Sequence, residues 1–176
     1  MEKNKNLESS GFTLIELMVV ILIMGVLAAA GFANYVQLQR TKTVEEELRK
    51  LKSVIILASQ KAASADASIC TGSSDINIRV KLYRLQINSN SYTITADCEN
   101  TTNGTAIPPN PINYKIKSGA LQVVSGPNQL RFEINTGKIL NNNATSGCYK
   151  LTYQGKTKFL KIKNVYAEAS IQNNCS

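Results

Sequence analysis

An uncharged apolar run near the N-terminus limits what this chain can fold into. From Leu17 to Gln39, 23 consecutive residues carry no charge. A helix rises about 1.5 Å per residue, so the run would cover roughly 30 Å, the thickness of the hydrocarbon core of a bilayer. A secretory signal peptide has a shorter apolar core that ends at a small-residue cleavage site. We therefore expect the segment to stay in the mature protein, as a transmembrane helix over residues 12–39.

Glu16 is a carboxylate at the start of this apolar segment. Such a group inside a membrane costs about 2.5–3.5 kcal/mol on insertion scales, so it usually has a partner. Cleavage between Gly11 and Phe12 would create a cationic amine one helical turn away, on the same chain or on a neighbouring one. The alternative is a Glu close to the membrane surface that reaches water.

The sequence GFTLIELMVV over residues 11–20 resembles the processing site of type IV pilins and type II secretion pseudopilins. The resemblance implies removal of a leader, residues 1–11, by a prepilin peptidase that cuts after Gly11 and N-methylates Phe12. It also implies a filament subunit whose helix packs in the filament core, with Glu16 paired to the Phe12 amine of the adjacent subunit. The partners would be other pilin or pseudopilin subunits, the peptidase and the bacterial inner membrane, with the remainder of the chain in the periplasm.

One departure from the family pattern bears on the subtype. Major pilins usually carry a Pro in the second half of the apolar run, whereas this run has Gly25, Gly31 and Ala33 and no Pro. The departure favours a minor pilin or a pseudopilin. The segment from Phe132 to Gly137, followed by a Gly-containing hairpin and a basic strand, is similar to the C-terminal part of GspH/FimT-type minor pilins.

A second helical pattern follows the apolar run. Apolar residues recur every three or four positions, and no Pro interrupts residues 12–69: Val44, Leu48, Leu51, Ile55, Ala58, Ala62 and Ala65. This stripe predicts one helix from Phe12 to about Ala67, with an amphipathic part over residues 40–69. A separate coiled-coil dimer is the alternative. Ala dominates the later stripe positions, which favours packing on a sheet instead.

After residue 70 the pattern changes to a period of two, with turn residues between the apolar stretches. Strands are predicted near residues 76–82, 92–98, 112–116, 130–134, 149–153 and 158–165. Short alternating strands of this kind indicate an antiparallel sheet or sandwich. The expected fold class is α+β: a long N-terminal helix packed on an antiparallel β-sheet head over residues 70–176, the lollipop arrangement of pilins.

The four cysteines, Cys70, Cys98, Cys148 and Cys175, contain no C-x-x-C pair. That spacing disfavours a thiolate metal site and favours two disulfides, which need an oxidising compartment. Three pairings are possible, and we predict the nearest-neighbour one, Cys70–Cys98 with Cys148–Cys175. Each closed loop would stabilise the head by roughly 3 kcal/mol on the entropic model.

The composition disfavours an enzyme. The chain has no His, which excludes Ser-His and Cys-His catalysis and His-ligated zinc. No phosphate-binding glycine loop or metal-spacing motif is present, and Glu133 and Glu168 form no recognisable catalytic pair. We therefore predict no catalytic residues, no cofactor and no metal.

Positive charge is concentrated in the last third of the chain. Residues 111–176 hold nine Lys or Arg against two Glu, a net charge of +7, within a total of +8. The ordinary interpretation is a solvated basic face. The alternative is a DNA-binding minor pilin of a natural-transformation uptake pilus, contacting DNA phosphates. Its candidate contacts are Lys150, Lys156, Lys158, Lys161 and Lys163. On one strand, Lys156 and Lys158 would share a face opposite Lys161 and Lys163, unless a bulge intervenes near Phe159.

Overall fold

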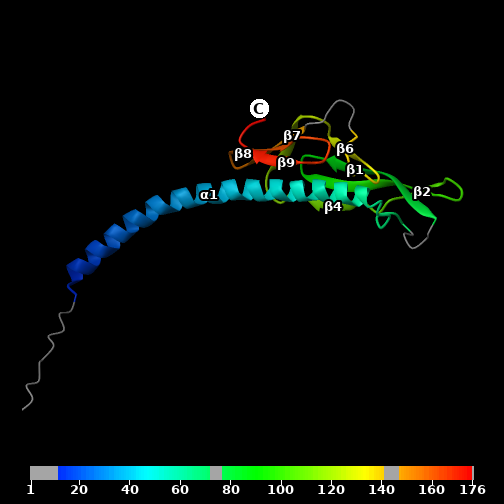
Figure 1. Cartoon of the computed structure of the whole chain (residues 1–176). Coiled ribbons are helices and arrows are strands. Elements are labelled where there is room, and N and C mark those ends of the chain that lie inside the picture. The colour runs from blue at the N-terminus through cyan, green and yellow to red at the C-terminus, as the bar shows by residue number, and fades with distance from the viewer. Residues whose placement is uncertain (1–11, 72–76, 141–146, 176) are drawn as a thin grey trace, which may run out of the picture. The chain divides into compact units, whose positions relative to one another are not determined.

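The computed structural model describes residues 12–71, 77–140 and 147–175 (Figure 1). Within these residues lie one helix and nine strands: α1 (Leu14–Ala63), β1 (Ile78–Ile87), β2 (Ser91–Asn100), β3 (Ala106–Ile107), β4 (Ile112–Lys115), β5 (Ala120–Ser125), β6 (Gln129–Glu133), β7 (Gly147–Tyr153), β8 (Lys156–Ile162) and β9 (Ala169–Gln172). The strand pairs are antiparallel, so the expected α+β fold of a helix packed on antiparallel sheets is confirmed. The chain forms two compact units, Met1–Gln39 (unit 1) and Arg40–Ser176 (unit 2), and their boundary falls within α1.

Unit 1 contains the N-terminal part of α1. Every large apolar side chain described between Phe12 and Phe32 is exposed, and the least exposed of them, Val20, is still 43% accessible. No helix among the described residues has the length and hydropathy that would mark it as a membrane span.

In unit 2 the apolar stripe of α1 is buried, as its periodicity predicts. Six of its members are at most 1% exposed: Val44, Leu48, Leu51, Ile55, Ala58 and Ala62. The seventh, Ala65, is exposed and lies beyond the helix. The helix ends at Ala63, so the predicted end near Ala67, and with it a helix over 40–69, is wrong. Ala65 takes a left-handed φ of 49°, and Asp66 accepts a hydrogen bond from the Ser68 backbone N–H, a local bond that competes with continued helix.

The first sheet has the strand order β3-β2-β1-β6, with β4 also paired to β2. In β2 the predicted alternation is confirmed, since Tyr92, Ile94, Ala96 and Cys98 are all buried. In β1, Val80 and Leu82 are buried as predicted, but Tyr83, which was predicted to face outward, is buried as well. A register shift between Val80 and Leu82 inserts one residue, so the core face continues through Tyr83 and Leu85. The strand also runs to Ile87, five residues beyond its predicted end.

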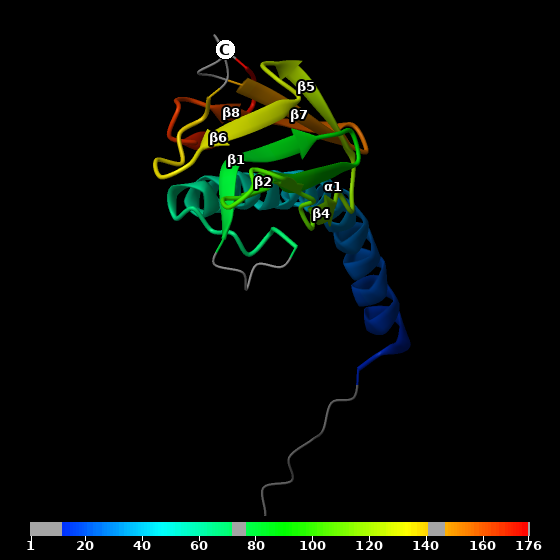
Figure 2. The same cartoon turned by 90° about the vertical axis from the view of Figure 1, so that its right-hand side faces the viewer.

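The second sheet has the order β5-β7-β8-β9. Its two central strands were predicted, whereas both edge strands, β5 and β9, were not. β3 at the edge of the first sheet was also missed. These edge strands are only two to six residues long, and they bury few side chains, so alternation gives little signal. Figure 2 shows the two sheets as separate groups of strands beside α1.

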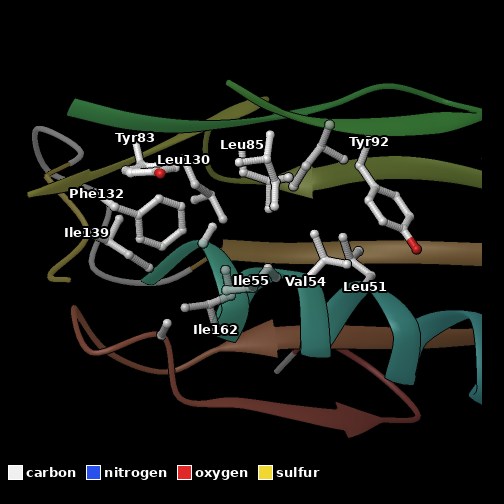
Figure 3. Packing of buried hydrophobic residues seen from close by; sticks show 14 of the residues in the cluster. Leu51, Val54, Ile55, Tyr83, Leu85, Tyr92, Leu130, Phe132, Ile139 and Ile162 are labelled. Carbon is white, nitrogen blue, oxygen red and sulfur yellow. The ribbon is translucent and has the colours of Figure 1, made fainter. Parts of the chain in front are cut away.

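A single apolar core joins the helix to both sheets. In Figure 3, Leu51, Val54 and Ile55 of α1 point toward Leu85 of β1 and Leu130 of β6. The largest fully buried side chains include Tyr83, Tyr149 and Phe132. Both sheets therefore pack on the part of α1 that carries the apolar stripe, from Val44 to Ala62.

Two disulfides tie loops to strands in unit 2. Cys70, after the helix, is joined to Cys98 of β2, and Cys148 of β7 is joined to Cys175, with Cα–Cα distances of 6.0 Å in both pairs. These are the two nearest-neighbour pairs among the three possible pairings. None of the four cysteines is a free thiol in the described structure.

Candidate assembly site

The start of α1 is closed by reciprocal hydrogen bonds between Thr13 and Glu16. The Glu16 backbone N–H donates to Thr13 Oγ1 at 3.3 Å, and the Thr13 backbone N–H donates to Glu16 Oε2 at 3.1 Å. The Thr13 hydroxyl donates to the same Oε2 at 3.0 Å. This is a capping box, in which two otherwise unpaired helix donors are satisfied.

The capping box gives Glu16 a partner inside its own chain, which the sequence interpretation missed. The signal was present, because Thr followed three residues later by Glu before an apolar run marks a helix start. Glu16 Oε1 takes no part in the three bonds with Thr13. One carboxylate oxygen of this exposed side chain therefore closes the helix, and the other is outside the capping box.

The residues at the expected cleavage point are described only in part. Phe12 is 87% exposed, directly before Thr13. Gly11 and the expected leader, residues 1–11, lie outside the described residues. Among the described side chains of unit 1, Phe12, the Thr13–Glu16 capping box and the large apolar side chains up to Phe32 are all exposed.

The five candidate lysines do not share one face. β8 pairs with β7 in unbroken register from Lys156 to Ile162, so no bulge occurs at Phe159. By alternation, Lys156 and Lys158 lie on the face of Leu160 and Ile162, which belong to the core. Lys158 Nζ lies 3.0 Å from Glu45 Oε1 on α1, and it donates to Asn173 Oδ1 at 2.9 Å.

The remaining lysines lie elsewhere. Lys161 lies on the opposite face of β8, opposite Cys148, and Lys150 lies on that same outer face, opposite Phe159. Lys163 follows the end of β8, in a turn where its backbone N–H donates to the Glu168 carbonyl at 2.7 Å. The register therefore divides the five lysines between two faces of the second sheet and a loop.

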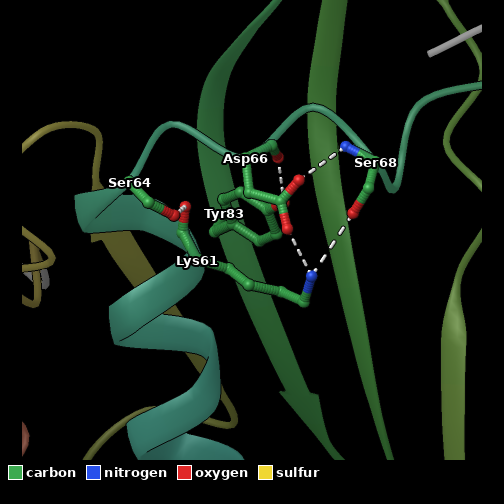
Figure 4. Close-up of polar contacts among 5 residues, drawn as sticks. All are labelled: Lys61, Ser64, Asp66, Ser68 and Tyr83. Atoms are coloured by element: carbon green, nitrogen blue, oxygen red, sulfur yellow. Dashed lines mark hydrogen bonds and ion pairs between the residues drawn. The ribbon is translucent and has the colours of Figure 1, made fainter. Parts of the chain in front are cut away.

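A polar cluster fastens the end of α1 to β1 (Figure 4). Lys61 Nζ lies 2.5 Å from Asp66 Oδ2 and 3.3 Å from Ser68 Oγ, and the Tyr83 hydroxyl donates to the Asp66 carbonyl. The Lys61 ammonium, followed by the Ser68 backbone N–H, lowers the pKa of Asp66 to about 2. Burial raises the pKa of Tyr83. The Lys61–Asp66 ion pair and the Tyr83 hydrogen bond thus connect the C-terminal end of α1 to β1.

Glu133 and Glu168, the two carboxylates considered as a catalytic pair, each accept a hydrogen bond from a different neighbour. Glu133 accepts a hydrogen bond from the Thr136 hydroxyl, and Glu168 accepts one from Asn164 Nδ2 at 2.9 Å. Within the described ranges, no group of three or more His, Cys, Asp or Glu side chains could hold a metal ion. Among the predicted site residues that the structure describes, Phe12 and Glu16 at the start of α1 therefore form the main candidate site.

Comparison with known proteins bears on this same segment. No curated protein and no solved structure matches the chain. Residues 8–32 match the family described as the prokaryotic N-terminal methylation motif, and the matched region includes Phe12, Thr13 and Glu16. This motif is the prepilin signal of type IV pilin-like proteins and implies processing by a prepilin peptidase, so the N-terminal segment is similar to that of pilin-like and pseudopilin subunits.

Proposed function

We propose that the protein is a minor structural subunit of a type IV pilus or a type II secretion pseudopilus, cut after Gly11 and N-methylated at Phe12. The observation that supports this most is the N-terminal methylation motif over residues 8–32. The apolar side chains of unit 1, exposed within this chain, supply a surface for packing against other subunits. The function is assembly, and it involves no catalysis and no cofactor.

In this proposal residues 12–39 anchor the subunit in the bacterial inner membrane, with unit 2 in the periplasm, before the helix moves into the filament core. Glu16 then pairs with the Phe12 amine of the adjacent subunit. The capping box supports this scheme, because it gives the carboxylate hydrogen-bond donors before assembly and leaves Oε1 outside those bonds. The two disulfides fit an oxidising compartment such as the periplasm.

Two substitutions at Glu16 separate capping from pairing. Glu16→Gln keeps an oxygen that can close the capping box but removes the charge, whereas Glu16→Ala removes both. We expect both variants to be stable in the inner membrane and absent from sheared filaments. Thr13→Val, which weakens the cap and keeps the charge, is the control and should still be incorporated. Normal incorporation of Glu16→Gln would contradict the proposed ion pair.

The proposed processing has its own test. Mass spectrometry of the mature protein from cells should find a chain that begins with N-methylated Phe12. A mature chain that still begins at Met1, or at any residue other than Phe12, would contradict the proposal.

The assignment to a minor, GspH/FimT-type subunit is supported by the absence of Pro from the apolar run and by the strand pattern after Phe132. The subunits that assemble with this protein would distinguish a type IV pilus from a type II secretion pseudopilus. Shearing of cells, followed by mass spectrometry of co-purifying subunits, should recover either pilus or secretion-system components.

The alternative function, DNA binding in an uptake pilus, relies on Lys150, Lys156, Lys158, Lys161 and Lys163. Their division between two faces and a loop gives no single stripe for a phosphate backbone. A gel-shift titration of the full chain in detergent at two salt concentrations tests it. A salt-sensitive shift would support DNA binding, and no shift at low salt would exclude it.

A further inference from the structure

Five cations gather at one end of unit 2, near the boundary between the two units. Arg40 and Lys42 are on α1, Lys115 ends β4, Lys117 lies in the loop between β4 and β5, and Lys156 begins β8. All are at least partly exposed, and among the described residues none of the five forms an ion pair. We call these five residues the basic collar.

Contacts along α1 place the sheet residues of the collar at this end. Lys158 binds Glu45, and β8 continues from Lys158 back to Lys156, away from the core residues Leu160 and Ile162. Lys156 is therefore two residues from the Lys158–Glu45 ion pair, on the side away from the core residues of β8.

Lys115 and Lys117 flank Ile116, which lines a small cavity with Glu47, Leu48 and Leu51 of α1. After Lys117, Gly119 packs so closely on β7 that a Cβ would lie 2.6 Å from the Thr152 carbonyl oxygen. Thr152 of β7 is paired with Thr157 of β8, the residue after Lys156. The loop that holds Lys117 and the start of β8 that holds Lys156 are therefore neighbours.

The opposite end of unit 2 has a different charge arrangement. That end is marked by Ser59, whose hydroxyl donates to the Gly137 carbonyl at 2.8 Å. There Arg79 and Lys81 both bind Glu99, and Lys61 binds Asp66. At the collar end, the nearby acids on α1 are Glu45, which binds Lys158, Glu47, which binds Lys50, and the exposed Glu46. The collar end thus keeps an excess of positive charge.

The collar borders the point where the uncharged run Leu17–Gln39 ends, one residue before Arg40. Resting on the proposed membrane anchoring, we propose that the basic collar binds the anionic phospholipid surface at which the anchor emerges. Cations within a few ångströms of such a surface are attracted to its phosphates, and salt screens that attraction. The collar would hold unit 2 at the membrane before assembly.

The test uses the full chain added to vesicles of phosphatidylcholine alone or with phosphatidylglycerol. Flotation measures anchoring, and amine acylation followed by mass spectrometry measures the exposure of each lysine. We expect flotation with both vesicles. Acylation of Lys117 and Lys156 should slow about threefold or more in anionic vesicles and recover in 1 M NaCl. Lys81 and Lys138, at the other end, should be unchanged.

A matched pair of variants assigns the effect to the collar. Lys117→Gln/Lys156→Gln should reduce the protection of Lys115 in anionic vesicles. Lys138→Gln/Lys163→Gln removes the same charge away from the collar and should leave that protection intact. If both pairs reduce it equally, only net charge matters and the collar is overturned.

The remaining outcomes separate this inference from the proposed function. Flotation with equal acylation in both vesicles would overturn the collar and leave the anchor standing. Absence of flotation would overturn both. Protection of Lys117 and Lys156 by a DNA duplex on neutral vesicles, without protection by anionic lipid, would overturn the lipid assignment and identify the collar as a nucleic-acid surface.

Discussion

The two parts of α1 differ in what covers their apolar side chains. After residue 40, Leu48 and Ile55 are fully buried under the sheets, whereas before it Leu22 is 68% and Phe32 70% exposed. Most helices in proteins are stabilised by packing of an apolar face. Unit 2 supplies that packing from its own sheets, whereas the large apolar side chains described in unit 1 are exposed. In the proposed function, a membrane or other subunits would cover them.

Removing one leucine from each part tests this comparison most strongly. Leu48→Ala leaves a cavity in the core and should lower the free energy of unfolding of unit 2 by about 3–4 kcal/mol. Leu22→Ala, the matched control, should change it by no more than about 0.5 kcal/mol. Urea unfolding of the full chain in mild detergent measures both. Equal losses would show that unit 1 contributes to the same core.

A second test compares two glycines in unit 2. Gly137 has a φ of 66°, and a Cβ there would overlap the backbone carbonyl of Ser59 on α1. Gly137→Ala should cost about 2–3 kcal/mol, since left-handed strain and the displaced helix contact add together. Gly155 has a similar φ of 78° with open space around it, so Gly155→Ala should cost only about 1 kcal/mol. The difference between the two thermal shifts measures how tightly α1 fits in unit 2.

The C-terminal end of α1 should depend on pH. Asp66 has a pKa of about 2, below its ordinary 3.8, because Lys61 and Ser68 bind the ionised form. Its contribution of about 1–2 kcal/mol is therefore present above about pH 4 and is lost as the pH falls toward 2. Asp66→Asn should lower the free energy of unfolding at pH 7 and have little effect at pH 2. A loss that is constant across this range would contradict the ion-pair origin.

The N-terminal end of α1 should show the smallest effect. Thr13→Val removes the hydroxyl of the capping box and should weaken the first turn by about 1 kcal/mol. Hydrogen exchange of the amides from Leu14 to Leu17 should quicken, while those of Leu48 and Leu51 should not change. If the exchange of Leu48 also quickens, the two parts of the helix are more strongly coupled than their burial indicates.

The sequence predicted what depends on periodicity and missed what depends on individual side chains. The stripe from Val44 to Ala62 and the alternation of β2 follow from burial on one face, so the helix, the sheets and the core could be predicted. The bulge after Val80 and the helix end at Ala63 each depend on one local arrangement. The alternation of β8 predicts opposite faces for Lys158 and Lys161, but the ion pair between Lys158 and Glu45 of α1 could be found only in the structure.

The two disulfides make the oxidation state of each molecule depend on the compartment that its unit 2 has reached. A chain still facing a reducing compartment presents four thiols, and a chain whose unit 2 matches this structure presents none. An alkylating reagent added to lysed cells would therefore separate, by mass, oxidised molecules from reduced ones. If the proposed periplasmic location of unit 2 holds, the oxidised fraction measures export without any knowledge of the filament.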